Sequence, residues 1–562
     1  MINTIKTSFV ESNARERALG ILDQENHREL LGPSDEFESP HLEPQGIVPQ
    51  SDDGVVVAKG TIHNHQAIVI SIEGKFQGGG IGEVSGAKVA GALELALKDC
   101  EKGKKVIPVL VFDTGGVRLQ EANYGLLSIA EICAAIVALR HYVPVIGVIP
   151  GKIGAFGGMS ITAGLCSSIL MTREGRLGLN GPEVIEQEAG IREFDSKDRQ
   201  LIWGTIGGEQ RMNSGFADFL VKDDQYLIKE TITSIINDKI HAQAPRTERI
   251  SQYQTLLNLV DPTQPLTPEK VRSLWLQSED CVEEGDKDVI NSSKDTGRGS
   301  TWFDLLRGEF PEVGDIPSVR VSDGMIGEKK VRFIAVVPDQ HSRFPRARNG
   351  EVGLLEGWSI AKQIHDVIKE DQGKEKRAIV AIVDVPSQAY GYREELLGIH
   401  QACAAAVDAY ASARLLGHPI ISFIPGKAIS GAFLSHGMQA NRLIALRDDG
   451  VNIHVMSKQS AARVTQRSLE ELEEATKKVP AMAYDIQSFE KLGALFSLVD
   501  GVEADSPGLE DRTIICKEIE KALEDILVED SNDLSIRLKT SFALTGRAAS
   551  IKVRQKLEQQ WS

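Results

Sequence analysis

Two stretches of this 562-residue chain repeat one pattern: VIGVIPGKIGAFGGMS at residues 145–160 and IISFIPGKAISGAFLS at residues 420–435. Each begins with a short apolar run, continues through Pro-Gly-Lys, and ends in small residues that open an Ala- and Leu-rich segment. The pattern predicts a buried strand, a tight turn and a helix N-terminus. Such a turn directs free backbone N–H groups outward, and the helix dipole favours negative charge there. We therefore expect two anion-stabilising turns on two related folding units.

The chain before the first stretch supplies another turn of this kind. Residues 107–112 read IPVLVF, a fully apolar run, and residues 113–118 read DTGGVR, after which a helical pattern leads to residue 145. Strand, glycine turn and helix in succession predict a βαβ series with parallel strands. Because the carboxyl ends of adjacent parallel strands lie side by side, we expect Gly115-Gly116 and Gly157-Gly158 to face one pocket.

A third glycine-rich segment, FQGGGIGEVSGAKV, spans residues 76–89 and runs into a helical pattern. Its spacing does not satisfy G-x-G-x-x-G, so it does not favour a dinucleotide site. A glycine-rich turn between strand and helix permits the backbone at Gly79 and Gly80 to approach a ligand closely. A plain tight turn explains the same glycines, and the residues alone leave both interpretations open.

The second half of the chain repeats this order of elements. AIVAIV at residues 378–383 leads to DVPSQ at residues 384–388, and a helical pattern then leads to the second stretch. The strand-like residues 331–337 and the glycine turn at 349–353 parallel earlier segments of the first half. We infer that one α/β domain has been duplicated.

Composition and charge are those of an ordinary soluble globular protein that is too long for one core. Apolar residues make up 41% and charged residues 25%, and the length fits two domains of about 250 residues. A net charge of −17 argues against nucleic acid as the main partner. The N-terminus lacks the apolar core of a signal peptide, and we expect no window of the roughly 18 apolar residues that a membrane span needs. Six cysteines without a C-x-x-C pair favour reduced thiols, so we expect a cytoplasmic protein with no membrane contact.

His63 and His65 flank Asn64 near the start of the first domain. Two histidines one residue apart can ligate a metal, but no third ligand lies near them in the sequence. A solvated strand end is the favoured interpretation, and no metal site is expected.

Composition also marks the domain boundaries. Residues 281–300 are polar, acidic and poor in large apolar side chains, as is typical of a linker. We therefore expect one domain over residues 1–280 and a second over residues 301–562. A charged helical tail from about residue 508 is expected to serve packing or oligomer contacts.

Several of these segments resemble the motifs of acyl-CoA carboxyltransferases. DTGGVRLQE at residues 113–121 is similar to their D-S-G-G-A-R-x-Q-E turn, and residues 78–88 resemble their G-G-S-x-G-E-V-x-G-x-K segment. DVP at 384–386 and SGAF at 430–433 resemble the D-V-P-G-F and G-G-A-Y turns of their carboxyl-terminal domain. The resemblance implies an α/β fold with two tandem crotonase-like, carboxyltransferase-type ββα-superhelix domains.

Within that superfamily the chain resembles the biotin-independent malonate decarboxylases. RLGLNGPEVIEQ at residues 176–187 and RFPRARNGEVG at residues 343–353 carry this resemblance. Residues 1–280 are similar to the beta subunit and residues from about 297 to 562 to the gamma subunit, so the two look fused. The resemblance implies loss of CO2 from a malonyl thioester on an acyl-carrier subunit, which leaves the acetyl thioester.

This reaction requires hydrogen-bond donors for an oxygen that gains charge as the carbon–carbon bond breaks. Each well-aimed backbone donor in a dry site is worth roughly 2.7–4 kcal/mol. We expect one donor set on Gly115 and Gly116 with Gly158 and Met159, and another on Gly431 and Ala432. The resemblance implies that one set holds the thioester oxygen and that the other faces the departing carboxylate, in an order that the sequence leaves open. Glycines that merely permit turns and close packing are the alternative.

The second half departs from the carboxyltransferase pattern at one place. Ser387 and Gln388 replace the usual Gly-Phe, so the pocket that receives biotin in relatives is expected to be altered. No Ala-Met-Lys-Met biotin-attachment sequence occurs in the chain, which favours a proton as the acceptor of the enolate. Candidates for the proton donor stay open: His436, Ser435, Tyr390 and Tyr392.

The resemblance also implies a carrier-bound substrate. Gly79 and Gly80 are expected to lie against it, and Arg343, Arg346 and Arg348 to grip the phosphates of the carrier's arm or an acidic carrier surface, since guanidinium groups suit phosphates. A solvated loop is the alternative for the three arginines. The arm is expected to be a phosphopantetheine-type group derived from dephospho-CoA, with no cofactor bound covalently to this chain. Expected partners are the acyl-carrier and acyl-transferase subunits, with a homo-oligomer as a further possibility.

Two other classes of function remain open from the sequence. A biotin-dependent carboxyltransferase or decarboxylase component would use the same fold but move the carboxyl group to biotin. A non-catalytic scaffold for an acyl-transferase partner would tolerate bulky residues at Gly158 and Gly431.

Overall fold

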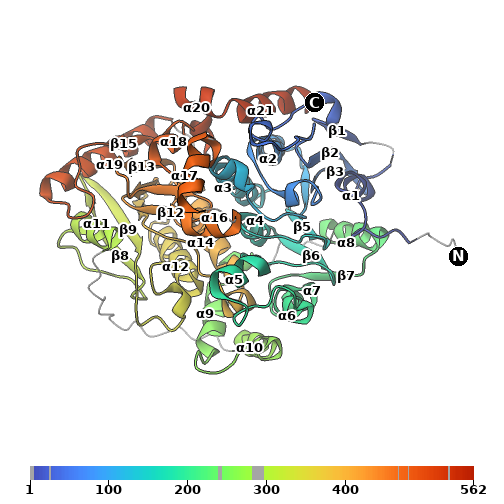
Figure 1. The fold of residues 1–562 in the computed structure, drawn as a ribbon, viewed down its shortest axis with the longest axis horizontal. Helices are drawn as coiled ribbons and strands as arrows, with labels where there is room; N and C mark the ends of the chain where they lie inside the picture. The colour runs from blue at the N-terminus through green and yellow to red at the C-terminus, as the bar shows by residue number, and fades with distance from the viewer. Residues whose placement is uncertain are drawn as a thin grey trace. The chain divides into compact units, whose positions relative to one another are not determined.

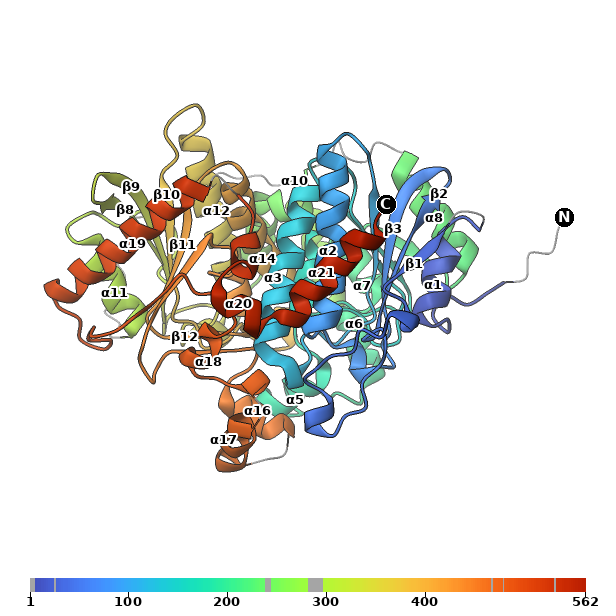
Figure 2. The same ribbon diagram turned by 90° about the horizontal axis from the view of Figure 1, so that it is seen from above.

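A computed structural model describes residues 6–24, 27–237, 244–280, 297–465, 468–478, 480–529 and 532–562 (Figures 1 and 2). Its contacts divide the chain into two compact units, each of which gathers segments distant in sequence. Unit 1 comprises Met1–Arg249, Leu266–Leu276 and Ala548–Ser562, and unit 2 comprises Ile250–Pro265 and Gln277–Arg547. Two short segments of the expected domain over residues 1–280, residues 250–265 and 277–280, thus belong to unit 2. The segment Ala548–Ser562 of the expected second domain belongs to unit 1. The expected linker, residues 281–300, lies almost wholly outside the described residues.

Unit 1 is built on one sheet whose seven described strands follow one another in sequence order. Strands β1 to β3 are antiparallel and strands β3 to β7 are parallel. The strands are β1 (Arg28–Leu30), β2 (Val55–Ile62), β3 (His65–Ile72), β4 (Ile107–Val111), β5 (Ile146–Ile149), β6 (Ser168–Thr172) and β7 (Phe219–Val221). Every residue of β4, β5 and β6 is buried, as expected for parallel strands covered on both faces.

The helices of unit 1 are α1 (Ala14–Ile21), α2 (Glu83–Glu101), α3 (Ala122–Leu139), α4 (Gly158–Leu165), α5 (Pro182–Ala189), α6 (Arg199–Ile206), α7 (Gly208–Asn213), α8 (Gln225–Asn237), most of α10 (Pro268–Asp280), and α21 (Ala548–Gln560). The C-terminal helix α21 lies along α2, more than 400 residues earlier in the chain (Figure 2). The expected packing role of the tail is thus seen for its last helix.

The segment Leu119–Leu139, which contains α3, is long and apolar enough to cross a membrane. The expectation that the chain contains no such window is therefore wrong. The window is completely buried, and α3 packs against α2 and α4. This complete burial is typical of a core helix.

Unit 2 repeats the plan of unit 1 with a sheet of six described strands in the order β15-β13-β11-β10-β9-β8. The strands are β8 (Val319–Ile326), β9 (Lys329–Val336), β10 (Ala378–Ile382), β11 (Ile420–Ile424), β13 (Arg442–Leu446) and β15 (Ser497–Val499), with β12 (Lys427–Ile429) and β14 (Asn452–His454) forming a separate parallel pair. The helices are α9 (Ile250–Leu259), α11 (Arg298–Arg307), α12 (Leu354–Glu370), α13 (Tyr392–Leu396), α14 (Ile399–Leu415), α15 (Ser430–Ser435), α16 (Lys458–Thr465), α17 (Leu469–Lys478), α18 (Ile486–Glu490), α19 (Leu509–Glu529) and α20 (Ser541–Gly546).

Strands β2 to β7 of unit 1 match the six described strands of the unit 2 sheet in order, and β1 has no counterpart among them. An antiparallel pair of eight-residue strands, β2–β3 in unit 1 and β8–β9 in unit 2, precedes a parallel series in each. Beyond the strands, the bridge between Thr114 and Ala155 has its counterpart between Val385 and Ala428. The predicted α/β fold and the predicted duplication of one domain are confirmed.

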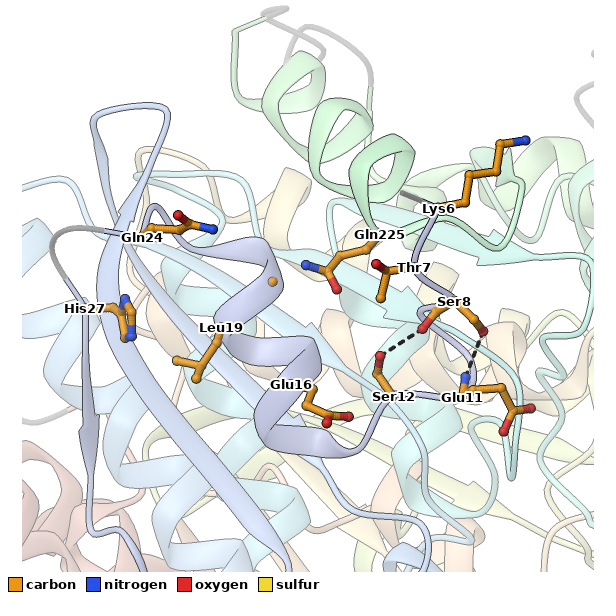
Figure 3. Close-up of a pocket in the computed structure, with 11 residues that line it drawn as sticks. Lys6, Thr7, Ser8, Glu11, Ser12, Glu16, Leu19, Gln24, His27 and Gln225 are labelled. Carbon is orange, nitrogen blue, oxygen red and sulfur yellow. Dashed lines mark hydrogen bonds between the residues drawn. The ribbon is translucent and has the colours of Figure 1, made fainter. Parts of the chain in front are cut away.

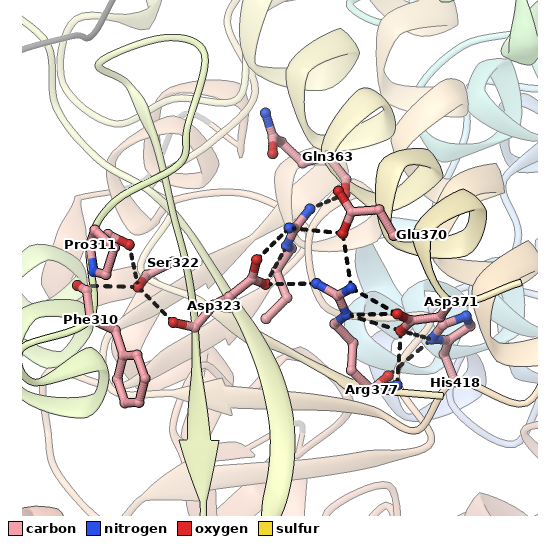
Figure 4. Close-up of polar contacts among 10 residues, drawn as sticks. Phe310, Pro311, Ser322, Asp323, Gln363, Glu370, Asp371, Arg377 and His418 are labelled. Carbon is pink, nitrogen blue, oxygen red and sulfur yellow. Dashed lines mark hydrogen bonds and ion pairs between the residues drawn. The ribbon is translucent and has the colours of Figure 1, made fainter. Parts of the chain in front are cut away.

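A network of charged side chains covers the amino end of β10 in unit 2 (Figure 4). Arg377 lies 2.7 Å from Asp371, 2.9 Å from Glu370 and 3.2 Å from Asp323. Arg332 of β9 contacts the same Asp323 at 2.7 Å. Burial opposes ionisation of Asp323, but hydrogen bonds and charge from Arg332 outweigh it and hold the pKa of Asp323 below its usual range. The network fixes the amino end of β10, whereas the glycine turns follow the carboxyl ends of the strands.

Candidate functional site: two matching glycine turns

The glycine turns after β4 and β5 meet in unit 1, as predicted. The Thr114 N–H donates to Gly154 O at 2.8 Å, and the Phe156 N–H donates to Thr114 O at 3.1 Å. Gly116 and Gly157 have φ of 104° and 54°, and a Cβ built on Gly116 would lie 3.1 Å from Gly157 Cα. Glycine at both positions permits this approach of the two turns.

Three of the four predicted N–H donors of this turn already bind acceptors within the chain. The Gly115 N–H donates to Gly78 O at 2.8 Å and the Gly116 N–H to Thr114 Oγ1 at 3.0 Å. The Met159 N–H reaches back to Phe156 O at 3.2 Å. The Gly158 N–H, at the first residue of α4, has no acceptor within the described part of the chain. Gly158 is therefore the donor that this turn leaves open.

The turn after β11 has the same construction in unit 2. Ser430 takes the left-handed conformation of Gly157, with φ of 60°, and the short helix α15 carries Gly431 and Ala432 in its first turn. The Gly431 N–H donates to Gln388 Oε1 at 3.0 Å. For the Ala432 N–H, the described residues offer no acceptor. Gly431 and Ala432 are buried, as are Gly158 and Met159 of unit 1.

An aspartate at the end of each central strand holds the Pro-Gly-Lys loop beside its turn. Asp113 accepts the Ile153 N–H at 2.6 Å, and Asp384 accepts the Lys427 N–H at 3.0 Å. The second oxygen of Asp113 binds Arg17 at 2.8 Å, whereas that of Asp384 accepts the Gly299 N–H at 3.0 Å. Sequence reasoning missed this positioning role, although an aspartate directly follows the apolar strand in both halves.

Two buried cations of the carboxyltransferase-like motifs anchor the chain before β2. Arg118 lies 2.7 Å from Asp53 and 2.6 Å from Glu121, and burial raises the pKa of Asp53 to about 6 although Arg118 opposes the shift. Lys88 donates to Leu31 O at 2.9 Å and to Asp52 O at 3.0 Å. Burial lowers the pKa of Lys88 to about 8. Both cations thus hold the segment before β2 within unit 1.

Gly79 and Gly80 pack against the turn that follows β4. A Cβ on Gly79 would lie 2.1 Å from Asp113 O, and one on Gly80 would lie 3.0 Å from Arg118 Cβ. Their N–H groups donate to Phe76 O and Gln77 O. The structure thus shows close packing for these glycines, and their contact with substrate stays a prediction.

The three arginines expected to grip a carrier arm lie around the 3₁₀ turn Pro345–Ala347. Arg343 donates to Leu257 O, and Arg348 donates to Ser342 O at 2.9 Å. Arg346 lies over the Tyr390 ring, 5.8 Å from its centroid. All three are partly exposed, so none is a freely solvated side chain and their phosphate-binding role stays a prediction.

Two candidates for the proton donor are committed to internal hydrogen bonds. Ser435 Oγ donates to Gly431 O at 2.7 Å. His436 Nε2 lies 3.0 Å from Ile382 O and Nδ1 lies 3.0 Å from Tyr410 Oη, so the ring donates to the carbonyl and accepts from the phenol. Burial lowers the pKa of His436 to about 4. Both are fully buried and serve the fold, whereas Tyr390 and Tyr392 are partly exposed.

Each unit has a cavity of its own. In unit 2 a cavity of about 310 Å³ lies at the carboxyl ends of β9 and β10, lined by Asp384, Pro386 and Lys427 beside the turn, and by Asn349 and Glu351. In unit 1 an open groove of about 710 Å³ lies along α1 and the start of α8 (Figure 3). None of the predicted site residues lines the groove of unit 1. The unit 2 cavity adjoins a predicted donor turn.

His63 and Asn64 form the exposed two-residue turn between β2 and β3, and both have positive φ. His65 is also exposed and begins β3. The favoured interpretation, a solvated strand end, is confirmed. Over the residues that the structure describes, no group of three His, Cys, Asp or Glu side chains is arranged to hold a metal ion.

Comparison with known proteins gives matches to a protein family and to several curated proteins. The family model "Malonate decarboxylase gamma subunit" matches residues 347–561. The malonyl-S-ACP:biotin-protein carboxyltransferase MADC of Malonomonas rubra is 38% identical over 301 residues, which is 51% of this chain and 93% of MADC. MADD of the same organism is 39% identical over 200 residues, 35% of this chain and 68% of MADD.

Solved structures give matches of the same kind. A chain of the Pseudomonas malonate decarboxylase hetero-tetramer, crystallised with malonate, is 52% identical over 48% of this chain and 97% of its own length, with a TM-score of 0.46. Transcarboxylase 12S, crystallised with methylmalonyl-coenzyme A, is 21% identical over 92% of this chain and 91% of its own, with a TM-score of 0.35.

Proposed function

Because the chain belongs to the family of malonate decarboxylase and malonyl-thioester carboxyltransferase subunits, we propose that it removes CO2 from a malonyl thioester held on an acyl-carrier subunit. It is an enzyme of the carboxy-lyase and carboxyltransferase type. The product of the proposed reaction is the acetyl thioester. The single observation that carries the proposal is the repeated turn, which presents an uncommitted N–H at Gly158 in unit 1 and at Ala432 in unit 2.

In the proposed reaction, negative charge develops on the thioester oxygen. When the bond between the α-carbon and the carboxylate breaks, CO2 leaves and the bonding electron pair stays on the α-carbon. The pair delocalises onto the thioester oxygen to give an enolate, and a proton added to the α-carbon completes the acetyl group. Backbone donors fixed before the reaction stabilise such an oxygen without reorganising, each by roughly 2.7–4 kcal/mol.

The two turns provide such donors at buried positions. Gly158 and Ala432 are buried, and each lies in the first turn of a helix whose dipole favours negative charge. Asp113 and Asp384 hold the loops in front of them. We propose that one turn binds the thioester oxygen and that the other faces the carboxylate.

We further propose that a phosphopantetheine-type arm delivers the substrate, and that an acyl-carrier and an acyl-transferase subunit work with this chain in the cytoplasm. The Pseudomonas malonate decarboxylase is a hetero-tetramer, and the 52% sequence identity of one of its chains supports a multi-subunit assembly here too. On this chain we propose that Arg346, which is partly exposed and lies over the Tyr390 ring, meets the arm.

Arg346→Gln tests the contact with the arm. We expect the KM for malonyl-carrier to rise about tenfold, as for loss of one charge-assisted hydrogen bond, while kcat stays near the wild-type value. Lys329→Gln, which changes a cation on the exposed β8–β9 turn of unit 2, is the control. An unchanged KM for Arg346→Gln would remove this residue from the proposal.

Transfer of the carboxyl group to biotin is the second candidate, because MADC and MADD are both described as biotin-protein carboxyltransferases. The deciding experiment incubates the purified chain with malonyl-CoA or malonyl-carrier, without biotin, ATP or metal, and follows CO2 release. Decarboxylation predicts release that avidin leaves unchanged. Release that requires a biotin protein and stops with avidin would establish the second candidate instead.

A further inference from the structure

The two donor turns differ at the residue that faces the first turn of the short helix. The bridges of Ile81 with Val117 and of Val352 with Gln388 place Val117 and Gln388 at matching positions. Val117 has no polar side-chain atom, and the Gly158 N–H of unit 1 has no acceptor in the described part of the chain. Gln388 places its amide oxygen 3.0 Å from the Gly431 N–H. A carbonyl-type oxygen therefore already occupies one donor of the second turn.

Main-chain hydrogen bonds fix the backbone on either side of Gln388. The Val352 N–H donates to Ser387 O at 3.1 Å, and the Ala389 N–H donates to Val352 O at 2.9 Å, on either side of Gln388. The residue is partly exposed, and its amide is linked to the backbone through three rotatable bonds. The two main-chain hydrogen bonds do not involve the amide oxygen that binds Gly431.

We propose that Gln388 is a gate on the second donor turn, whose amide oxygen an anionic oxygen of the substrate displaces from Gly431. This inference rests on the proposed function. A hydrogen bond to a charged oxygen is about twice as strong as one to a neutral amide, so a carboxylate or enolate oxygen outcompetes Gln388, whereas a neutral carbonyl or ureido oxygen competes on equal terms. The gate therefore selects for substrates that bring negative charge to this turn.

Two substitutions at Gln388 are expected to change the KM in opposite directions. Gln388→Leu keeps the size of the side chain and removes the acceptor, as at Val117, so the substrate no longer competes. We expect the KM for malonyl thioester to fall about 2- to 10-fold, the range for one neutral hydrogen bond, with kcat nearly unchanged. Gln388→Glu puts a charged acceptor on Gly431 and should raise the KM. Gln372→Leu, the same change at an exposed residue after α12, is the matched control.

A KM for Gln388→Leu that equals or exceeds the wild-type value would overturn the gate. Hydrogen exchange of the peptide that contains Gly431, measured without substrate, gives a readout that does not depend on turnover. Loss of the acceptor should speed exchange at Gly431 in Gln388→Leu but not in Gln372→Leu. If the wild-type protein releases no CO2 the proposed function fails, and the exchange result still decides whether Gln388 caps the turn. Equal exchange in wild type and Gln388→Leu would also overturn the gate.

Discussion

Ser430 holds a left-handed backbone conformation where unit 1 has Gly157. A non-glycine residue in this region costs of order 1 kcal/mol and persists only where the surroundings fix it. Here Ala428 pairs with Val385 on one side, and the Gly431 N–H binds Gln388 on the other. The strain is therefore maintained at the same turn in which the chemistry is proposed.

His436 gives a prediction at the same scale. Its folded-state pKa of about 4 lies below the value of 6.5 expected in the unfolded chain. Between these pH values the unfolded chain binds a proton that the folded protein does not, so the free energy of unfolding rises with pH across this window. His436→Gln removes this dependence, which amounts to about 3 kcal/mol.

Denaturant unfolding at pH 4 and pH 7 measures the effect. The wild-type protein should lose about 3 kcal/mol more than the variant on going from pH 7 to pH 4. Equal losses would show that His436 is not held neutral by burial.

At the scale of elements, the two ends of the unit 2 sheet have different roles, and the carboxyl end resembles that of the unit 1 sheet. The carboxyl ends of β4 and β5, and of β10 and β11, carry the turns, whereas the amino end of β10 is held by the Arg377 network (Figure 4). Charged side chains at the amino end fix the strands on which the turns depend. Substitutions at the amino end should therefore lower the free energy of unfolding more than they affect the proposed reaction.

Arg377→Met tests the network. The variant removes the guanidinium that pairs with Asp371 in a partly buried site and one of the two arginines that contact Asp323, so we expect unit 2 to lose about 2–3 kcal/mol of unfolding free energy. Lys329→Met removes an exposed pair with Glu375 and should change stability by less than about 0.5 kcal/mol. Thermal or denaturant unfolding of both variants makes the comparison, and equal stabilities would contradict a structural role for Arg377.

At the scale of the whole molecule, the compact units do not follow the order of the sequence. The C-terminal helix α21 belongs to unit 1, where Arg554 lies 2.9 Å from Glu94 and 2.7 Å from Glu131. Val553 and Leu557 of this helix are fully buried. The last helix of the chain therefore completes the first unit.

Leu557→Ala should weaken unit 1 although the residue lies at the far end of the sequence. Truncation of a fully buried leucine costs about 2–4 kcal/mol through lost contacts and the cavity left behind. The neighbouring Glu558→Ala, at an exposed position, should cost less than about 0.5 kcal/mol. Hydrogen exchange in α2 reports the difference, and equal protection in the two variants would contradict the assignment of α21 to unit 1.

The sequence was sufficient to predict the duplication, because apolar strands and glycine turns leave the same local pattern at 107–118 and 378–388. It was also sufficient to predict that Gly116 and Gly157 lie close together, since adjacent parallel strands end side by side. It failed for the Gln388 cap, because a side-chain contact across 43 residues leaves no local signal. The place of α21 was hidden for the same reason: only tertiary packing selects the surface that an amphipathic helix covers.

The central claim is that main-chain N–H groups of the two turns stabilise the enolate. Gly158 is the first residue of α4, where proline is tolerated because its ring fits helical φ. Gly158→Pro therefore removes the open N–H and retains the helix, whereas Gly158→Ala adds a methyl group and retains the N–H. We predict that kcat for CO2 release from malonyl-carrier is about 10²- to 10³-fold lower for Gly158→Pro than for Gly158→Ala. Equal kcat values for the two folded variants would contradict the claim.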